Sequence, residues 1–192
     1  MKKVIYLQQI GELDKTILIK LKKNLKWSFK EFNLSLKILD TIIPLNETEY
    51  NQIRRQYNAD LIMLKLLKYN SEKSYFRILG VMDYDIYVRQ YNFIFGTASN
   101  PERMNFQFSP VALISVARLR EQFWGRVENN SLFELRVLKE AIHELGHTFG
   151  LFHCENQCIM VFSNWIGDTD DKPPIFCESC FKKLNYFLNS LS

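Results

Sequence analysis

Histidine and cysteine are scarce in this sequence, which has three histidines and four cysteines among 192 residues. All seven lie between His143 and Cys180, and the chain before His143 contains neither residue type. Histidines and cysteines in scattered structural roles would not concentrate in this way. Imidazole and thiolate are typical zinc ligands, so the sequence predicts two zinc sites here, one with an open position for chemistry and one closed.

Long apolar runs are also missing, and none approaches the roughly 18 residues that a membrane-spanning helix needs. The start of the chain, Met1 to Gln9, has a single short apolar stretch that is too brief for a signal peptide and is typical of a first strand. We therefore expect a cytoplasmic protein. In that reducing compartment the cysteines stay thiolates that can bind metal and do not form disulfides.

Strong net charge is absent as well, since the chain carries a formal charge of only +4. The densest basic cluster, Lys15 to Lys30, lies on one expected helix, where a solvated face explains it. We expect neither nucleic acid nor a membrane as a partner.

The composition favours one folded domain, because 47% of the residues are apolar and 15 are phenylalanine. There is no internal repeat and no low-complexity linker. Apolar runs and alternation predict strands at residues 4–7, 34–43, 61–67, 76–82, 93–98 and 112–117. Spacing and caps predict an amphipathic helix over residues 13–29 and a short helix from Asn46 to about Tyr57, while Asn100 to Glu102 is expected to be a loop. The class is therefore α/β.

A long helix is predicted from Ser131 onward, because Ser131 and Glu134 form a capping-box pattern. Its expected buried stripe is spaced at intervals of three and four: Leu135, Leu138, Ile142, Leu145 and Phe149. Gly150 suits the left-handed position that ends a helix. Asp168 to Pro174 is predicted to be a loop, followed by a last helix with Phe181, Leu184 and Phe187 or Leu188 facing inward.

The long helix carries the chemistry. His143 and His147 are four residues apart and therefore share one helix face, and a turn at Gly150 would return His153 to the same metal. Three imidazoles leave a fourth position for water, whose pKa zinc lowers to about 7. Glu144 stands beside the ligands as the general base and acid. A bare His-Glu-x-x-His also occurs by chance, and a metal site can persist without turnover.

Four cysteines predict the closed site: Cys154, Cys158, Cys177 and Cys180. They come as two close pairs, and four thiolates would leave no position for water, which makes this zinc structural. The alternatives are four unrelated buried cysteines or a redox Cys-x-x-Cys at Cys177, although the latter lies outside any βαβ unit.

These motifs resemble those of the archaemetzincins, a branch of the metzincin zinc peptidases. The matching run is His143-Glu144-x-x-His147-x-x-Gly150-x-x-His153-Cys154, followed by Cys158-Ile159-Met160 and Cys177-x-x-Cys180. Three other phrases are similar to that family: Phe93-Ile94-Phe95-Gly96, Arg118-Leu119-Arg120 and Ser163-Asn164. The resemblance covers most of the chain from about Leu61 onward.

The resemblance implies a catalytic zinc on the three histidines, Glu144 as base, a Met-turn at Met160 and a second zinc on the four cysteines. It also implies a metzincin-like α/β (α+β) domain with a twisted mixed sheet, a long active-site helix and a small C-terminal subdomain stabilised by zinc. We expect one peptidase domain over residues 1–192, with an upper subdomain of about 1–150 and a lower one of about 151–192.

The sequence departs from the family pattern in two places. Three residues separate the first two cysteines and sixteen follow Met160 before Cys177, and each count is one short of the usual pattern. Some metzincins have an oxyanion-stabilising tyrosine two residues after the methionine, but this chain has Phe162. No cysteine precedes the long helix, so we expect no cysteine-switch propeptide.

Together these features predict a cytosolic zinc metallopeptidase that acts on peptides or small proteins, with two zinc ions per chain. Phe93 to Ser99 is the expected sheet edge for an extended peptide, and a proline at Thr97 is expected to remove an edge donor. The alternative is an inactive or latent metzincin-like module that binds a peptide or partner. A nucleic-acid protein that docks through its cysteines is disfavoured, because residues 154–180 contain one basic residue, Lys172, and five acidic ones.

Overall fold

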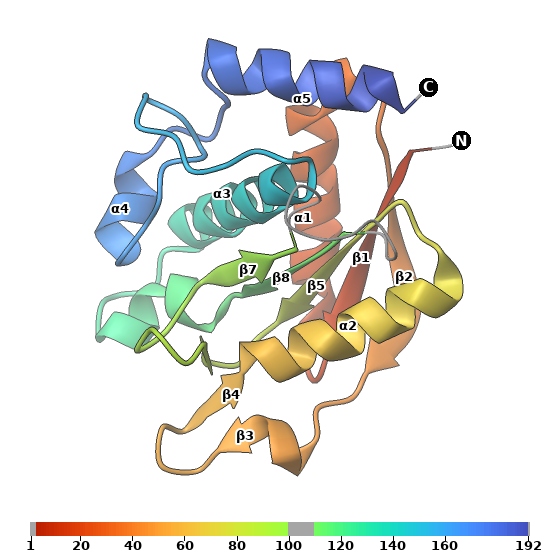
Figure 1. The fold of residues 1–192 in the computed structure, drawn as a ribbon. Coiled ribbons are helices and arrows are strands. Elements are labelled where there is room, and N and C mark those ends of the chain that lie inside the picture. Colours follow the sequence, from red (N-terminus) through yellow and green to blue (C-terminus); the bar gives the residue numbers. More distant parts are fainter. Residues whose placement is uncertain (1–2, 100–109, 192) are drawn as a thin grey trace.

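The computed structural model describes residues 3–99 and 110–191 and confirms a mixed α/β fold. Its main sheet has five strands in the order β2-β1-β5-β8-β7 (Figure 1). Four of them are parallel, namely β1 (Val4–Ile10), β2 (Ser35–Ile43), β5 (Arg77–Met82) and β8 (Val111–Ser115). The edge strand β7 (Gly96–Ala98) runs antiparallel to β8. A second, smaller sheet contains β3 (Tyr50–Asn51), β4 (Gln56–Asn58) and β6 (Ile86–Tyr87).

Helices cover both faces of the main sheet (Figure 1). Helix α2 (Ala59–Lys73) packs on one face, and α1 (Lys15–Ser28) and α3 (Asn130–Thr148) pack on the other. Every residue of β5 and β8 is buried, as expected for parallel strands covered on both sides. Beyond α3 come α4 (Ile166–Asp171) and α5 (Glu178–Ser190). No helix among the described residues is long and apolar enough to cross a membrane.

The strand predicted at residues 61–67 is wrong, because this segment lies in α2. Asn58 caps the helix by accepting a hydrogen bond from the Asp60 backbone N–H. The buried positions then follow at helical intervals: Ala59, Ile62, Leu66 and Asn70. A short apolar run does not distinguish a buried strand from a helix, and the cap at Asn58 was the overlooked signal.

The short helix predicted from Asn46 to about Tyr57 is also wrong. The capping box between Asn46 and Glu49 is present, but it closes only one 3₁₀ turn, Glu47–Glu49. The chain then forms the β3–β4 hairpin, in which the rings of Tyr50 and Tyr57 lie 4.9 Å apart. A cross-strand aromatic contact is available to the hairpin and not to a continued helix.

Helix α3 is present, but it begins earlier than predicted. Its N-cap is Asn129, whose side chain accepts from the Leu132 N–H, so Ser131 lies inside the helix. Glu134 is therefore not a capping residue and pairs with Lys20 of α1 at 2.7 Å. Leu135 is partly exposed, so the predicted buried stripe is wrong at this position. Gly150 has a φ of +86°, which confirms the predicted left-handed end.

The predictions at the C-terminal end and in the centre of the chain have mixed outcomes. The last helix is confirmed as α5, whereas residues 166–171, partly predicted as a loop, form α4. The strand expected at residues 93–98 is shorter, and the loop expected at residues 100–102 lies outside the described residues.

A buried arginine joins three parts of the fold. Arg77 of β5 donates from Nε to the carbonyl of Thr148 at the end of α3, 3.1 Å away. Its guanidinium stacks on Phe76, Phe149 and Phe187, of which the last belongs to α5. Burial lowers the pKa of Arg77 to about 9. A cation at the C-terminal end of a helix is stabilised by the helix dipole, which offsets part of the cost of burial.

Candidate metal centres

The three histidines converge at the end of α3, and we refer to His143, His147 and His153 as the histidine triad. Each offers a ring nitrogen, and these atoms all lie within 4.8 Å of one another. The Nε2 atoms of His143 and His147 are 3.1 Å apart. Two imidazole nitrogens on a tetrahedral zinc stand about 3.3 Å apart, given Zn–N bonds of about 2.0–2.1 Å. The donor set and its spacing therefore fit a zinc ion.

The outer nitrogens of two triad histidines are held by backbone carbonyls. His143 Nδ1 lies 2.9 Å from the carbonyl oxygen of Ile159, and His147 Nδ1 lies 2.7 Å from that of Leu151. A carbonyl only accepts, so Nδ1 carries the hydrogen and Nε2 does not, which is the tautomer that can bind a metal through Nε2. Burial also keeps the pKa of His143 well below its ordinary value, so this imidazole is neutral, as a metal ligand must be.

Glu144 lies buried beside the triad under the edge strand. A Cβ atom placed on Gly96 of β7 would stand 2.7 Å from Glu144 Oε1, so the carboxylate packs directly against this glycine. Burial, together with the nearby Glu140 carboxylate, raises the pKa of Glu144 well above its ordinary value. A raised pKa makes this carboxylate a stronger proton acceptor, as a general base requires.

The triad and Glu144 line a cleft of about 550 Å³. Its upper wall is β7, and its rim carries the aromatic rings of Tyr91, Phe152 and Phe162. The Phe162 ring lies 4.9 Å from that of His153 and 6.3 Å from that of Tyr91. Position 162 therefore offers an apolar face to the cleft and no hydroxyl.

The hydrogen-bond register of β7 shows which backbone groups face the free edge. Ser99 donates to Val111 at 2.9 Å, and Ser115 donates to Phe95 at 2.8 Å. Hydrogen-bonded pairs alternate in an antiparallel ladder, so Thr97 also faces β8, while the N–H groups of Gly96 and Ala98 point away from it. The choice of Thr97 for an edge-blocking proline is therefore wrong.

The four cysteines form a second cluster, the cysteine tetrad: Cys154, Cys158, Cys177 and Cys180. Their sulfur atoms all lie within 4.8 Å of one another. Cys154 Sγ and Cys177 Sγ are 3.8 Å apart. Tetrahedral Zn–S bonds of about 2.3 Å place two sulfurs about 3.8 Å apart, so the tetrad also fits zinc. The shortened loops do not prevent the four thiols from meeting.

The thiols of the tetrad differ in acidity. The backbone N–H of Cys180, in the first turn of α5, lowers the pKa of Cys177 to about 6. Burial raises the pKa of Cys158 and of Cys180. A thiol near a helix N-terminus ionises easily, which makes Cys177 a thiolate at neutral pH.

One short segment connects the two clusters. His153 belongs to the triad and its neighbour Cys154 to the tetrad. The Cys154 N–H donates to the Met160 carbonyl at 3.0 Å. The Met160 side chain is fully buried against Gly146 of α3, where an added Cβ atom would stand 2.5 Å from its sulfur. Met160 therefore lies against the helix at Gly146, between His143 and His147, as an apolar support.

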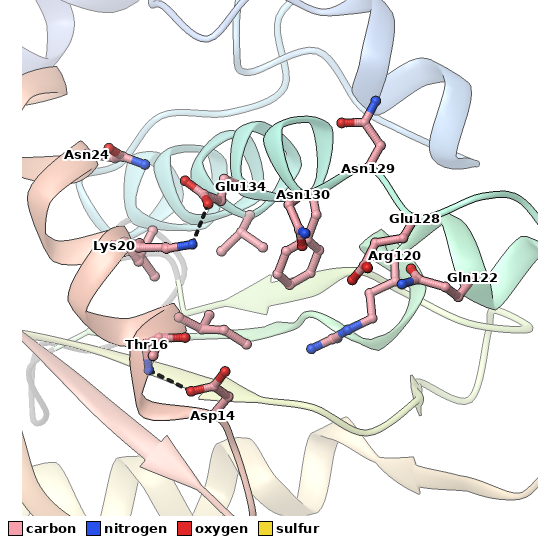
Figure 2. Close-up of a pocket in the computed structure, with 14 residues that line it drawn as sticks. Asp14, Thr16, Lys20, Asn24, Arg120, Gln122, Glu128, Asn129, Asn130 and Glu134 are labelled. Carbon is pink, nitrogen blue, oxygen red and sulfur yellow. Dashed lines mark hydrogen bonds and ion pairs between the residues drawn. The ribbon is translucent and has the colours of Figure 1, made fainter.

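A second cavity, of about 300 Å³, lies between the first turns of α1 and α3 (Figure 2). Its lining is mostly polar and includes the ion pair of Lys20 and Glu134. It contains no histidine or cysteine, so it offers neither of the zinc-ligand types found in the triad and the tetrad.

Sequence reasoning gave no role in the main cleft to several polar residues that line it, among them Glu140, Ser163 and Lys172. Lys172 Nζ lies 2.9 Å from Glu140 Oε1, and both side chains are almost fully buried. The sequence carried a signal for one of them, because Lys172 is the single basic residue between the first and last cysteine. Its contact with α3 depends on α4, which was not predicted.

Comparison with known proteins gives consistent matches over nearly the whole chain. A model of "Peptidase family M54" matches residues 2–186. The archaemetzincin of Methanocaldococcus jannaschii is 42% identical over 182 residues, which is 94% of this chain and 92% of that protein. A zinc-dependent peptidase from Methanocorpusculum labreanum has a TM-score of 0.80 at 27% identity, with 94% and 100% of the two chains covered. The archaemetzincin of Archaeoglobus fulgidus, solved with malonate, has a TM-score of 0.74 at 34% identity, with 94% and 99% covered.

Proposed function

This chain belongs to peptidase family M54, the archaemetzincins, and is a zinc metallopeptidase; we propose that the histidine triad holds its catalytic zinc and that Glu144 is its general base. The observation that carries the proposal is the convergence of three ring nitrogens beside a buried carboxylate in one cleft. The sequence places Glu144 next to a ligand on α3, and the carboxylate itself is not part of the donor cluster.

A zinc ion held by the triad supplies Lewis acidity, which polarises the peptide carbonyl and lowers the pKa of water. Glu144 takes the proton of the attacking water while the water oxygen bonds to the carbonyl carbon. The same carboxyl group then delivers that proton to the leaving amine as the C–N bond breaks. Gly96 holds the carboxylate in position by leaving no space between β7 and Glu144.

Peptide substrates extend along β7 in this proposal. The outward N–H and carbonyl groups of Gly96 and Ala98 are available to an added strand, which is how sheet edges recognise extended peptides. The aromatic rim supplies apolar contacts to the side chains of the peptide. A cleft of about 550 Å³ with a sheet edge as one wall favours peptides and unfolded segments over folded proteins.

The cysteine tetrad holds a second, structural zinc in this proposal. Four protein ligands fill a tetrahedral site, so this ion stabilises the segment from His153 to Cys180 and takes no part in hydrolysis. Four free thiols kept for metal also suit a reducing compartment, and we assign the protein to the cytoplasm on that basis.

The test combines metal analysis with digestion of a mixed peptide library. We expect two zinc ions per chain and cleavage products that disappear on chelation. The matched control is Glu144→Gln, which keeps size and shape but not basicity; it should retain zinc and lose roughly a hundredfold or more in turnover. A zinc-loaded wild type that cleaves no peptide would favour a latent binding module instead, and a Glu144→Gln variant as active as the parent would remove Glu144 from the mechanism.

A further inference from the structure

Two buried polar groups in the cleft have no hydrogen-bond partner among the described residues. They are the Lys172 ammonium and the Ser163 hydroxyl. Lys172 lies within ion-pair distance of Glu140 but is not aligned with it as a hydrogen bond, and 1% of its side chain is exposed. Both residues line the same cleft as the histidine triad.

A neighbouring lysine shows how this region satisfies a buried ammonium when structure is its only role. Lys139 Nζ donates to the carbonyls of Thr169 and Asp170, at 2.9 and 2.7 Å. Lys172 makes no such bonds, although it comes directly after the same helix α4. An ammonium has three donors, and the ion pair with one Glu140 oxygen leaves at least two of them unused, which is costly in a buried position. Its donors are therefore available to a molecule in the cleft.

The charges of the cleft indicate what that molecule carries. The cleft offers a buried ammonium and a buried hydroxyl, both of them donors, on the same lining as the triad. A carboxylate from the substrate accepts hydrogen bonds from both groups, and its charge is opposite to that of the ammonium.

The position of Lys172 relative to the catalytic helix sets which part of the substrate reaches it. Its ion-pair partner Glu140 precedes Glu144 by one helical turn, which advances about 5.4 Å along the axis. The scissile bond of the substrate lies at Glu144 and the triad. The side chain of a substrate residue that flanks this bond is long enough to cover one helical turn and reach Lys172.

We propose that Lys172 and Ser163 form a subsite for a carboxylate, so that the peptidase selects aspartate or glutamate directly beside the scissile bond. This inference rests on the proposed function, because it assigns the specificity of the same cleft. The occupant is an acidic peptide side chain. An amide of the same shape accepts from the same donors but carries no charge to attract the ammonium.

The first test measures selectivity. A zinc-loaded wild type is given paired peptides that differ only as Asp/Asn or Glu/Gln at the residues flanking the cut. We expect the acidic member to be preferred by roughly tenfold in kcat/KM, as for other single-group discriminations. The double variant Lys172→Met, Glu140→Gln removes the pair without leaving a lone charge, and it should abolish the preference. The exposed control Lys182→Met should retain it.

The second test measures binding and does not depend on turnover. Zinc-loaded Glu144→Gln protein is titrated with the same peptides by calorimetry. Tighter binding of the Asp peptide than of the Asn peptide, lost when Lys172→Met and Glu140→Gln are added, supports the subsite. Equal binding of the two peptides overturns it. If wild type cleaves nothing, the proposed function fails, and this titration still decides the subsite.

A third variant keeps the proposal testable if the double variant does not fold. Ser163→Ala removes one donor from the partly buried loop before α4 and leaves the Lys172–Glu140 pair intact. We expect it to reduce the Asp over Asn preference severalfold in both measurements. A folded, zinc-loaded Ser163→Ala protein with the full preference would remove Ser163 from the subsite.

Discussion

Gly96 and Glu144 are in direct contact across the catalytic cleft. A Cβ atom on Gly96 would stand 2.6 Å from Glu144 Cγ and 2.7 Å from Oε1, closer than side-chain atoms approach one another. The edge strand therefore has two roles in the proposed mechanism. It offers backbone groups to the peptide and it fixes the position of the carboxylate below it.

We expect Gly96→Ala to displace the Glu144 carboxylate without affecting the metal. A small misplacement of a catalytic group costs on the order of a hundredfold in rate, so kcat should fall by about that factor. Zinc content should be unchanged, because the three heavy atoms nearest to the added Cβ atom all belong to Glu144 and none to the histidine triad. Thr97→Ala, on the opposite face of the same strand, is the matched control. Wild-type turnover in Gly96→Ala would show that Glu144 tolerates the shift.

A proline scan of β7 tests the docking edge. Ala98→Pro removes an outward N–H donor and should lower peptide turnover while the protein remains folded. Thr97→Pro removes a donor that faces β8, so it should instead lower the thermal unfolding temperature. Turnover and melting curves measured on both variants separate the two effects. Normal turnover in folded, zinc-loaded Ala98→Pro would assign the peptide to another surface.

The two metal clusters are expected to be mechanically coupled. His153 and Cys154 are adjacent, and the tetrad also holds Cys158, two residues before Met160. We expect Cys177→Ser, Cys180→Ser to lose one zinc, loosen the His153 segment and lose activity, although no catalytic residue is changed. Ser179→Ala is the control within the same helix turn. A double variant with one zinc per chain and full activity would show that the clusters are independent.

The acidity of Cys177 gives a pH prediction. Its pKa is lowered to about 6, so in the folded, metal-depleted protein its thiolate persists down to about that pH. This group stabilises the folded state fully above its ordinary pKa of 9.0, and the contribution is lost as the pH falls through about 6. Iodoacetamide labelling, followed by mass spectrometry, should reach half its maximal rate near that pH at Cys177. A midpoint near 9 would contradict the assignment, and urea-unfolded protein supplies that reference.

The convergence of the histidines and of the cysteines was predictable because local spacing decides it. His143 and His147 share a face of any helix, and Gly150 with a positive φ turns the chain so that His153 comes back to them. The meeting of the four cysteines could also be predicted, because they form two close pairs along one short segment of the chain. Ligand type and spacing carry this information without knowledge of the sheet.

The remaining features depend on tertiary contacts that no local pattern contains. The apolar run in α2 is equally suited to a strand, and only packing against the sheet decides between them. The Lys172–Glu140 pair joins two helices, one of which was not predicted. The outward direction of Ala98 follows from its register with β8, and a shift of one residue would reverse it.

Arg77 affects how the protein unfolds. Its guanidinium binds the last carbonyl of the catalytic helix while stacking on a phenylalanine of the C-terminal helix, so one side chain spans the division drawn near residue 150. Moving the C-terminal helix away would remove the Phe187 ring from this cation and open its buried site to water. We therefore infer that the two parts are one cooperative unit, and that amide hydrogen exchange in α3, β5 and α5 proceeds through a single global opening.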